Sequence, residues 1–159
     1  MKIAMIGHKR IPGREGGIEI VVHELSKKLV EHGHTVVAYN RRGAHVAGSE
    51  FNEKPLKSCD GIILKNVFTF QNSKLNAIIY TVLATARALF GKYDVIHFHA
   101  EGPSSMAWLP KLFGIRTVCT IHGLDWQCPK WKGFAKKYLL FGEKTAAKYA
   151  DEIIVLSEN

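Results

Sequence analysis

Four of the eight histidines in the chain stand at or just after short apolar runs that are typical of buried strands. They are His8, His97, His99 and His122. Imidazole hydrogen-bonds sugar hydroxyls or phosphate, transfers protons, and binds metals. Metal binding is the weakest interpretation here, because the sequence has neither an HExxH motif nor a carboxylate pair near these histidines. His97 and His99 are equally well explained as buried structural histidines, whereas Gly123 leaves space for a ligand beside His122.

A glycine-containing loop follows the first apolar run and ends in Gly16 and Gly17, where a segment of helical periodicity begins. Glycines at a helix start let backbone N–H groups approach an anion, and the helix dipole favours phosphate there. We therefore predict that Gly16 and Gly17 bind phosphate. The alternative is that they only allow a tight loop.

The same region disfavours two nucleotide-binding classes. The loop does not match Gly-x-Gly-x-x-Gly, and Tyr39-Asn40-Arg41 stands where a dinucleotide-binding strand would end in an acidic residue. It also lacks the Gly-Lys-Ser/Thr ending of a P-loop. An NAD-dependent enzyme and a P-loop ATPase are thus disfavoured.

Aromatic and basic residues interleave between Leu124 and Lys148. This composition suits a peripheral membrane contact or a nucleic-acid stacking surface. The alternative is a helix whose aromatic side chains face the core while its lysines are solvated. Of the two functional interpretations we expect the membrane contact and no nucleic acid.

Apolar runs alternate with segments of helical periodicity along the chain. Strands are predicted at 3–6, 36–39, 61–64, 95–98, 117–121 and 153–156, and their continuous apolarity indicates strands covered on both faces. Helices are predicted at 18–29, ending at Gly33, at 75–90, ending at Gly91, after Pro103, and at about 131–149. The alternation predicts an α/β fold: a Rossmann-like, doubly wound parallel sheet of about six or seven strands with helices on both faces. The segment 41–58 has no periodicity and is predicted to be irregular.

The bulk composition fits one globular domain. The chain has 159 residues, 47% of them hydrophobic, and a formal net charge of +8 that attracts anions.

Three cysteines without a CxxC pair argue against a disulfide framework or a structural zinc site, and indicate a reducing compartment. The sequence shows neither a signal peptide nor an apolar run of transmembrane length. We expect a cytoplasmic protein, peripheral at most at the inner face of a membrane. Since the chain stops just past a strand, we also expect a larger protein.

Several motifs together resemble the N-terminal domain of family-four retaining glycosyltransferases, which have the GT-B architecture. They are Ile6-Gly7, the loop 12–19, Asp94-Val95-Ile96-His97-Phe98-His99, Thr120-Ile121-His122-Gly123-Leu124-Asp125-Trp126, and the segment 150–157. They span almost the whole chain and look closest to bacterial rhamnosyltransferase-like members of cell-surface polysaccharide pathways.

This resemblance implies an acceptor-side domain, 1–159, facing a donor-binding domain that is absent from the chain. It implies donor-phosphate binding by Gly16 and Gly17, a catalytic His122 near the transferred sugar, and acceptor or sugar contacts from His8, His99, Glu101 and Asp125. The substrates would be a nucleotide-sugar (UDP-, GDP- or dTDP-linked) and a glycan or lipid-linked glycan, with retention of configuration, no metal and no cofactor. The isolated chain would be inactive.

The alternative function is a non-catalytic Rossmann-like module that binds an anionic ligand or nucleic acid. Salt-dependent, sequence-blind binding of oligonucleotides would reveal such a module. An oxidoreductase is a third candidate.

Overall fold

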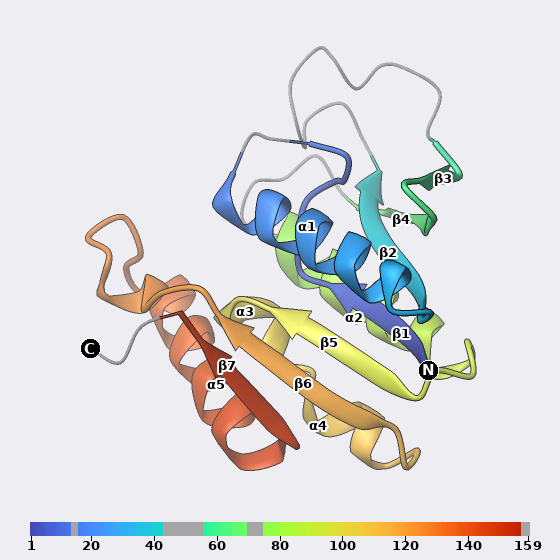
Figure 1. Cartoon of the computed structure of the whole chain (residues 1–159). Helices are drawn as coiled ribbons and strands as arrows, with labels where there is room; N and C mark the ends of the chain where they lie inside the picture. The colour runs from blue at the N-terminus through green and yellow to red at the C-terminus, as the bar shows by residue number, and fades with distance from the viewer. Residues whose placement is uncertain (14–15, 43–55, 70–74, 157–159) are drawn as a thin grey trace.

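A computed structural model describes residues 1–13, 16–42, 56–69 and 75–156. Its centre is a seven-stranded sheet in the order β3-β4-β2-β1-β5-β6-β7 (Figure 1). The strands are β1 (Lys2–Ile6), β2 (Thr35–Arg42), β3 (Ser58–Cys59), β4 (Ile62–Phe68), β5 (Val95–His99), β6 (Arg116–Ile121) and β7 (Glu152–Val155). All neighbouring pairs are parallel except β3 and β4. The predicted doubly wound parallel sheet is confirmed, except that the edge strand β3, which was not predicted, runs antiparallel to β4.

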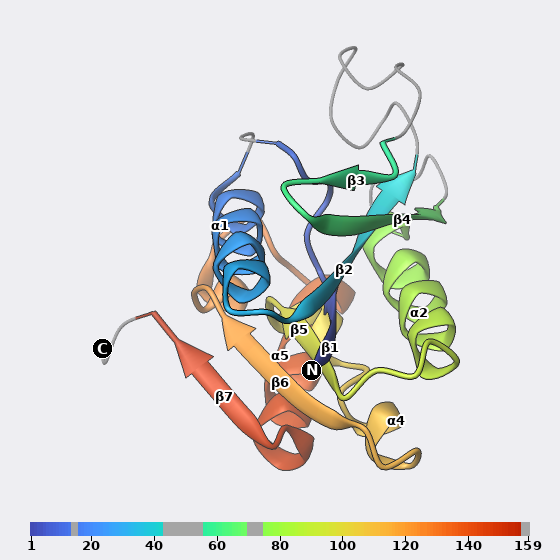
Figure 2. The ribbon, with the colours of Figure 1, turned by 45° about the vertical axis from the view of Figure 1, so that its right-hand side comes forward.

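Helices cover both faces of this sheet. They are α1 (Gly17–Glu31), α2 (Asn76–Leu89), α3 (Glu101–Ser104), α4 (Trp108–Lys111) and α5 (Phe134–Tyr149), with the 3₁₀ turn η3 (Asp125–Gln127) before α5. Figure 2 shows α1 on one side of the strands and α2 on the other. One core cluster joins the sheet to α1, and a second joins it to α2 and α5. The expected cover on both faces is therefore present.

Strand β1 shows how the sequence builds these two clusters. Ile3 and Met5 point into the cluster beside α1, whereas Ala4 and Ile6 point into the cluster beside α2 and α5. Successive side chains of a strand alternate between faces, so a continuous apolar run serves two cores. Full burial of an Ile or Met side chain contributes about 1.5–3 kcal/mol.

The predicted ends of the first two helices are confirmed. After α1, the N–H of Gly33 bonds to the Val30 carbonyl and the N–H of His34 to the Leu29 carbonyl, with Gly33 at φ +80°. This is a Schellman motif, which needs a residue that tolerates positive φ. Gly91 follows the C-cap of α2, and this position requires glycine for another reason: a Cβ there would lie 2.1 Å from the Tyr93 ring.

The structure corrects several sequence expectations. Part of the segment predicted to be irregular is a strand, because β2 runs to Arg42 and β3 pairs with β4; residues 43–55 lie outside the described residues. The third helix begins at Glu101, not after Pro103, because proline is tolerated in a first helical turn. The last long helix begins at Phe134 and not at 131. Strand β7 is exposed along its length and not covered on both faces, because it lies at the sheet edge.

The basic aromatic segment from Leu124 to Lys148 does not bury all its aromatic side chains. The buried face of α5 consists of Leu139, Gly142, Thr145 and Ala146. Phe134 is 72% exposed and Phe141 is 54% exposed. Within the described ranges, none of the helices has both the length and the apolar character to cross a membrane.

Candidate functional site

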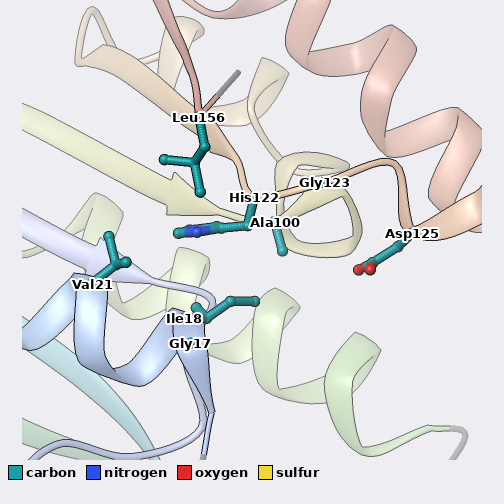
Figure 3. A pocket seen from close by; sticks show the side chains of 8 residues that line it. All are labelled: Gly17, Ile18, Val21, Ala100, His122, Gly123, Asp125 and Leu156. Carbon is teal, nitrogen blue, oxygen red and sulfur yellow. The ribbon is translucent and has the colours of Figure 1, made fainter. Parts of the chain in front are cut away.

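A pocket of about 300 Å³ opens at the carboxyl ends of the central parallel strands (Figure 3). In open α/β sheets, ligands bind at this edge. The start of α1, the β5–α3 junction, the segment after β6 and the end of β7 contribute its wall. The lining residues are Gly17, Ile18, Val21, Ala100, His122, Gly123, Asp125 and Leu156.

The N-terminus of α1 forms one side of this pocket. Gly16 is the extended N-cap residue, and its carbonyl accepts the first helical hydrogen bond, from Ile20. The first N–H groups of a helix have no intrahelical partner, so they are available to an anion. A Cβ at Gly17 would meet no atom within 4 Å, which shows that the backbone here borders open space.

Gly16 is less accessible than Gly17. A Cβ at Gly16 would lie 2.3 Å from Oε2 of Glu19, a buried carboxylate in the first turn of α1. The other oxygen, Oε1, accepts a hydrogen bond from the Lys9 backbone N–H at 2.8 Å. Glu19 thus holds the loop against the helix and takes up part of the positive field at the helix end. Gly17 is the better placed of the two predicted phosphate ligands.

His122 lies on the pocket wall and is supported from behind by other histidines. Its Nε2 lies 3.2 Å from Nδ1 of His99, which is fully buried. The His99 ring stacks on His97 at 4.1 Å, and Nε2 of His97 lies 2.7 Å from Oγ1 of Thr120. The histidines that follow β5 and β6 therefore lie together, and His8, which follows β1 at the same edge of the sheet, is close enough to affect the pKa of His99.

Burial keeps this histidine cluster uncharged near neutral pH. Burial lowers the pKa of His97 to about 4, and burial with the neighbouring imidazoles holds the pKa of His99 well below its ordinary value. The pKa of His122 is lowered by burial as well, although Asp125 partly offsets this. Of the facing ring nitrogens of His99 and His122, one must carry the proton. His122 offers the pocket a neutral hydrogen-bonding ring.

His8 is buried below the loop and does not line the pocket. Its Nε2 lies 2.9 Å from Oδ1 of Asn40. The Asn40 side chain also bonds to both the N–H and the carbonyl of Ile11. Burial lowers the pKa of His8 to about 4. His8 and Asn40 therefore anchor the loop that leads to α1.

Glu101 is a buried acid next to the pocket. It is 1% exposed, and among the described residues neither carboxylate oxygen meets hydrogen-bond geometry. Burial, together with the charges of Asp125 and Glu143, raises its pKa to about 7; the backbone N–H groups of Asp125 and Trp126 act in the opposite direction. Asp125 itself lines the pocket.

The residue before Glu101 is strained. Ala100 has φ +76° and ψ +160°, a conformation that L-residues rarely adopt. Such strain persists only where the surroundings impose it, and it is frequent at functional sites. Here it turns the chain sharply from β5 into α3 and puts Ala100 on the pocket wall and Glu101 beneath it.

Of the site residues predicted from the sequence, the structure brings Gly17, His122 and Asp125 together on one pocket. Gly16 and His99 are immediate neighbours of those residues, whereas His8 and Glu101 are buried. The apolar lining from Ile18, Val21 and Leu156 was not predicted, since nothing in the sequence distinguishes it from core residues.

The sequence analysis also did not identify Arg41 as a residue that connects the elements around the site. Its guanidinium bonds to the Asn76 side chain at 3.2 Å and to the Gly7 carbonyl at 3.4 Å, and lies 4.9 Å from the centre of the Tyr80 ring. Its place at the end of the second predicted strand was the only available signal.

The sheet and the pocket at its carboxyl edge are those of a Rossmann-like α/β domain. A model of Glycosyltransferase Family 4 matches residues 15–159. The chain belongs to this family, as its motifs predict.

A solved structure shows the same fold. Sucrose-phosphate synthase from Thermosynechococcus elongatus matches with a TM-score of 0.74 at 20% sequence identity. The match covers 98% of this chain and 42% of that one. The chain therefore spans less than half the length of that synthase. A search of curated proteins found no match.

Proposed function

We propose that this chain is the N-terminal, acceptor-side domain of a retaining glycosyltransferase with two facing domains. The complete enzyme transfers a sugar from a UDP-, GDP- or dTDP-sugar to a glycan or lipid-linked glycan in cell-surface polysaccharide synthesis. The second domain supplies most of the donor-binding groups, so residues 1–159 alone do not catalyse transfer. The observation that carries the proposal is the pocket where Gly17 at the start of α1 meets His122 and Asp125.

In this proposal the donor diphosphate approaches the N-terminus of α1. The open space at Gly17 lets oxygen atoms reach the backbone N–H groups, and the helix dipole stabilises the negative charge that grows as the diphosphate leaves. The acceptor hydroxyl attacks the anomeric carbon from the same face as the departing diphosphate. The new C–O bond forms as the old one breaks, and the hydroxyl proton passes to the leaving phosphate.

His122 then hydrogen-bonds the transferred sugar. Its neutral ring, fixed by His99, is suited to contact with a hydroxyl and adds no fixed positive charge. Asp125, on the same pocket, accepts hydrogen bonds from sugar hydroxyls. Glu101 and His8 lie behind these groups, so we assign them positioning of the acceptor side and of the loop.

Substitution of Gly17 tests the donor-phosphate role. A side chain at Gly17 meets open space, so Gly17→Val should fold as the wild type does, yet its methyl groups would stand where the phosphate approaches. Loss of one hydrogen bond to a charged group costs about 1.5–3 kcal/mol, which corresponds to about a 10- to 150-fold rise in the donor KM. The measurement is nucleoside diphosphate release by the complete enzyme with a panel of nucleotide-sugars.

Glu24→Ala is the matched control for this variant. Glu24 is exposed on the same helix, where it forms a surface ion pair, at 3.5 Å, with Lys27. It should leave the donor KM unchanged. A Gly17→Val enzyme with wild-type donor kinetics would show that the diphosphate binds elsewhere.

A membrane-associated acceptor is the second part of the proposal. Phe134 and Phe141 are exposed on a helix that also carries Lys136 and Lys137, a composition suited to an anionic lipid surface. Flotation with anionic liposomes should recover the protein, and Phe134→Ser should reduce that recovery. Equal recovery with neutral and anionic vesicles would contradict an electrostatic membrane contact.

A further inference from the structure

A second group of potential ligand atoms lies between α1 and the β3–β4 hairpin. His23 comes from α1, Cys59 ends β3, and Asp60 occupies the hairpin turn. One nitrogen, one sulfur and one oxygen from these three residues all lie within 4.8 Å of one another. None of the three residues lines the pocket described above.

The carboxylate of Asp60 is the centre of this group. Its Oδ2 lies 2.8 Å from Nε2 of His23, and it accepts a hydrogen bond from Sγ of Cys59 at 3.5 Å. In a tetrahedral zinc site, metal–ligand distances of about 2.0–2.3 Å place the ligand atoms about 3.5 Å apart. The Cys59–Asp60 pair already has this spacing. The His23–Asp60 pair has to open by less than about 1 Å, which side-chain rotation at the surface allows.

The backbone holds the hairpin in place against α1. Asp60 and Gly61 have φ values of +49° and +77°, the conformation of a two-residue Asp-Gly hairpin turn. A Cβ on Gly61 would lie 2.8 Å from Cγ1 of Val30, so the turn packs directly on the helix. The side chain of His23 is 16% exposed and that of Asp60 is 48% exposed. The ligand atoms are therefore positioned from two fixed elements, with one side open to water.

The charges around the group determine how a cation would bind. The Lys27 ammonium acts on both Cys59 and Asp60 and opposes a cation, but it lies 3.5 Å from the carboxylate of Glu24, which offsets it in part. Burial and the neighbouring carboxylate raise the pKa of the Cys59 thiol. Coordination of a metal therefore displaces the thiol proton to solvent.

We propose that His23, Cys59 and Asp60 bind one divalent transition-metal ion of the Zn²⁺ type, with water as the fourth ligand. One thiolate, one imidazole and one carboxylate form a mixed set that suits Zn²⁺ or Co²⁺ and not Mg²⁺ or Ca²⁺, which prefer oxygen ligands alone. The bound ion joins the edge hairpin to α1. None of its three residues lines the pocket, so metal binding can be tested separately from sugar transfer.

Cobalt titration of the full chain tests the site, because a thiolate–Co²⁺ bond gives a near-ultraviolet charge-transfer band and tetrahedral Co²⁺ gives intense visible bands. We expect one equivalent of Co²⁺ to bind with both signatures and Zn²⁺ to displace it. Cys59→Ser should abolish the near-ultraviolet band. Both Cys59→Ser and His23→Ala should weaken Co²⁺ binding by at least about tenfold, the smallest loss expected even for a residue that only supports a metal ligand.

Cys128→Ser is the matched control, because Cys128 is exposed on another part of the surface. It should leave the band and the affinity unchanged. Circular dichroism of each metal-free variant establishes that it is folded. A folded wild-type chain without a thiolate–Co²⁺ band, or a band that survives in Cys59→Ser, would overturn the proposal.

Discussion

Replacement of Glu101 by glutamine should stabilise the protein at high pH and not at low pH. Folding raises the pKa of this buried carboxyl from 4.5 to about 7. The folded state therefore holds the proton more tightly than the unfolded state, and stability is lost as the pH rises between these two values. Each pKa unit corresponds to about 1.4 kcal/mol, so the ionised carboxylate costs about 3 kcal/mol at pH 8. Glutamine is neutral throughout and avoids this cost.

Urea unfolding of both proteins at several pH values measures the effect. For each pH, the unfolding free energy of the wild type is subtracted from that of Glu101→Gln. This difference should be about 3 kcal/mol larger at pH 8 than at pH 4.5. Taking the difference removes the contribution of the other titrating groups, which both proteins share. Glu24→Gln, at an exposed position on α1, should show no such trend.

A difference that stays constant within about 0.5 kcal/mol over this pH range would contradict a raised pKa at Glu101, since surface substitutions commonly vary by that much. It would mean that Glu101 is solvated or paired when ionised. A trend of the opposite sign would mean that the folded state favours the charged carboxylate.

Three further outcomes follow from the same structure. Gly142→Ala should destabilise the protein by about 1–3 kcal/mol in urea unfolding, because its Cβ would lie 1.9 Å from the Glu101 carbonyl oxygen. This cost outweighs the better helix propensity of alanine. An unchanged unfolding midpoint would contradict this close packing. His122→Ala should lower the kcat of the complete enzyme by about 100-fold and also destabilise the protein by about 1–3 kcal/mol, because it leaves Nδ1 of the buried His99 ring without its partner; wild-type turnover would remove His122 from the reaction. Burial lowers the pKa values of His8 and His97 to about 4, so the Glu101→Gln protein, which lacks the opposite trend of the Glu101 carboxyl, should lose stability as the pH falls from 6.5 towards 4; unfolding curves of this variant that do not shift over this range would argue against neutral buried rings.

The fold could be predicted closely because its signals are local. Apolar runs bounded by turn residues define the parallel strands, and Gly33 ends α1 through a Schellman motif that only a residue tolerant of positive φ completes. The exposure of β7 could not be predicted, because an apolar run looks the same at a sheet edge as at its centre. The pairing of β3 has no periodicity to reveal it, since that strand has two residues.

The sequence predicts which residues follow the strands and therefore lie at the carboxyl edge of the sheet, and it predicts the site only to that extent. His122 and Asp125 follow β6, and Gly17 follows β1, so the parallel sheet brings them to one pocket. The sequence does not show how deeply a side chain is buried, because burial depends on how the elements pack. The burial of Glu101 and His8 could therefore not be predicted. The group of His23 with the Cys59–Asp60 turn was invisible for the same reason, because its members meet only when the hairpin packs on α1.

A structure of the complete enzyme with a nucleoside diphosphate bound would show most directly whether the first turn of α1 binds the donor phosphate. We expect a diphosphate oxygen within about 3.2 Å of a backbone nitrogen in the first turn of α1, at Gly17 or its neighbour, with His122 facing the sugar position. A diphosphate held wholly by other residues, with Gly17 facing bulk solvent, would contradict it.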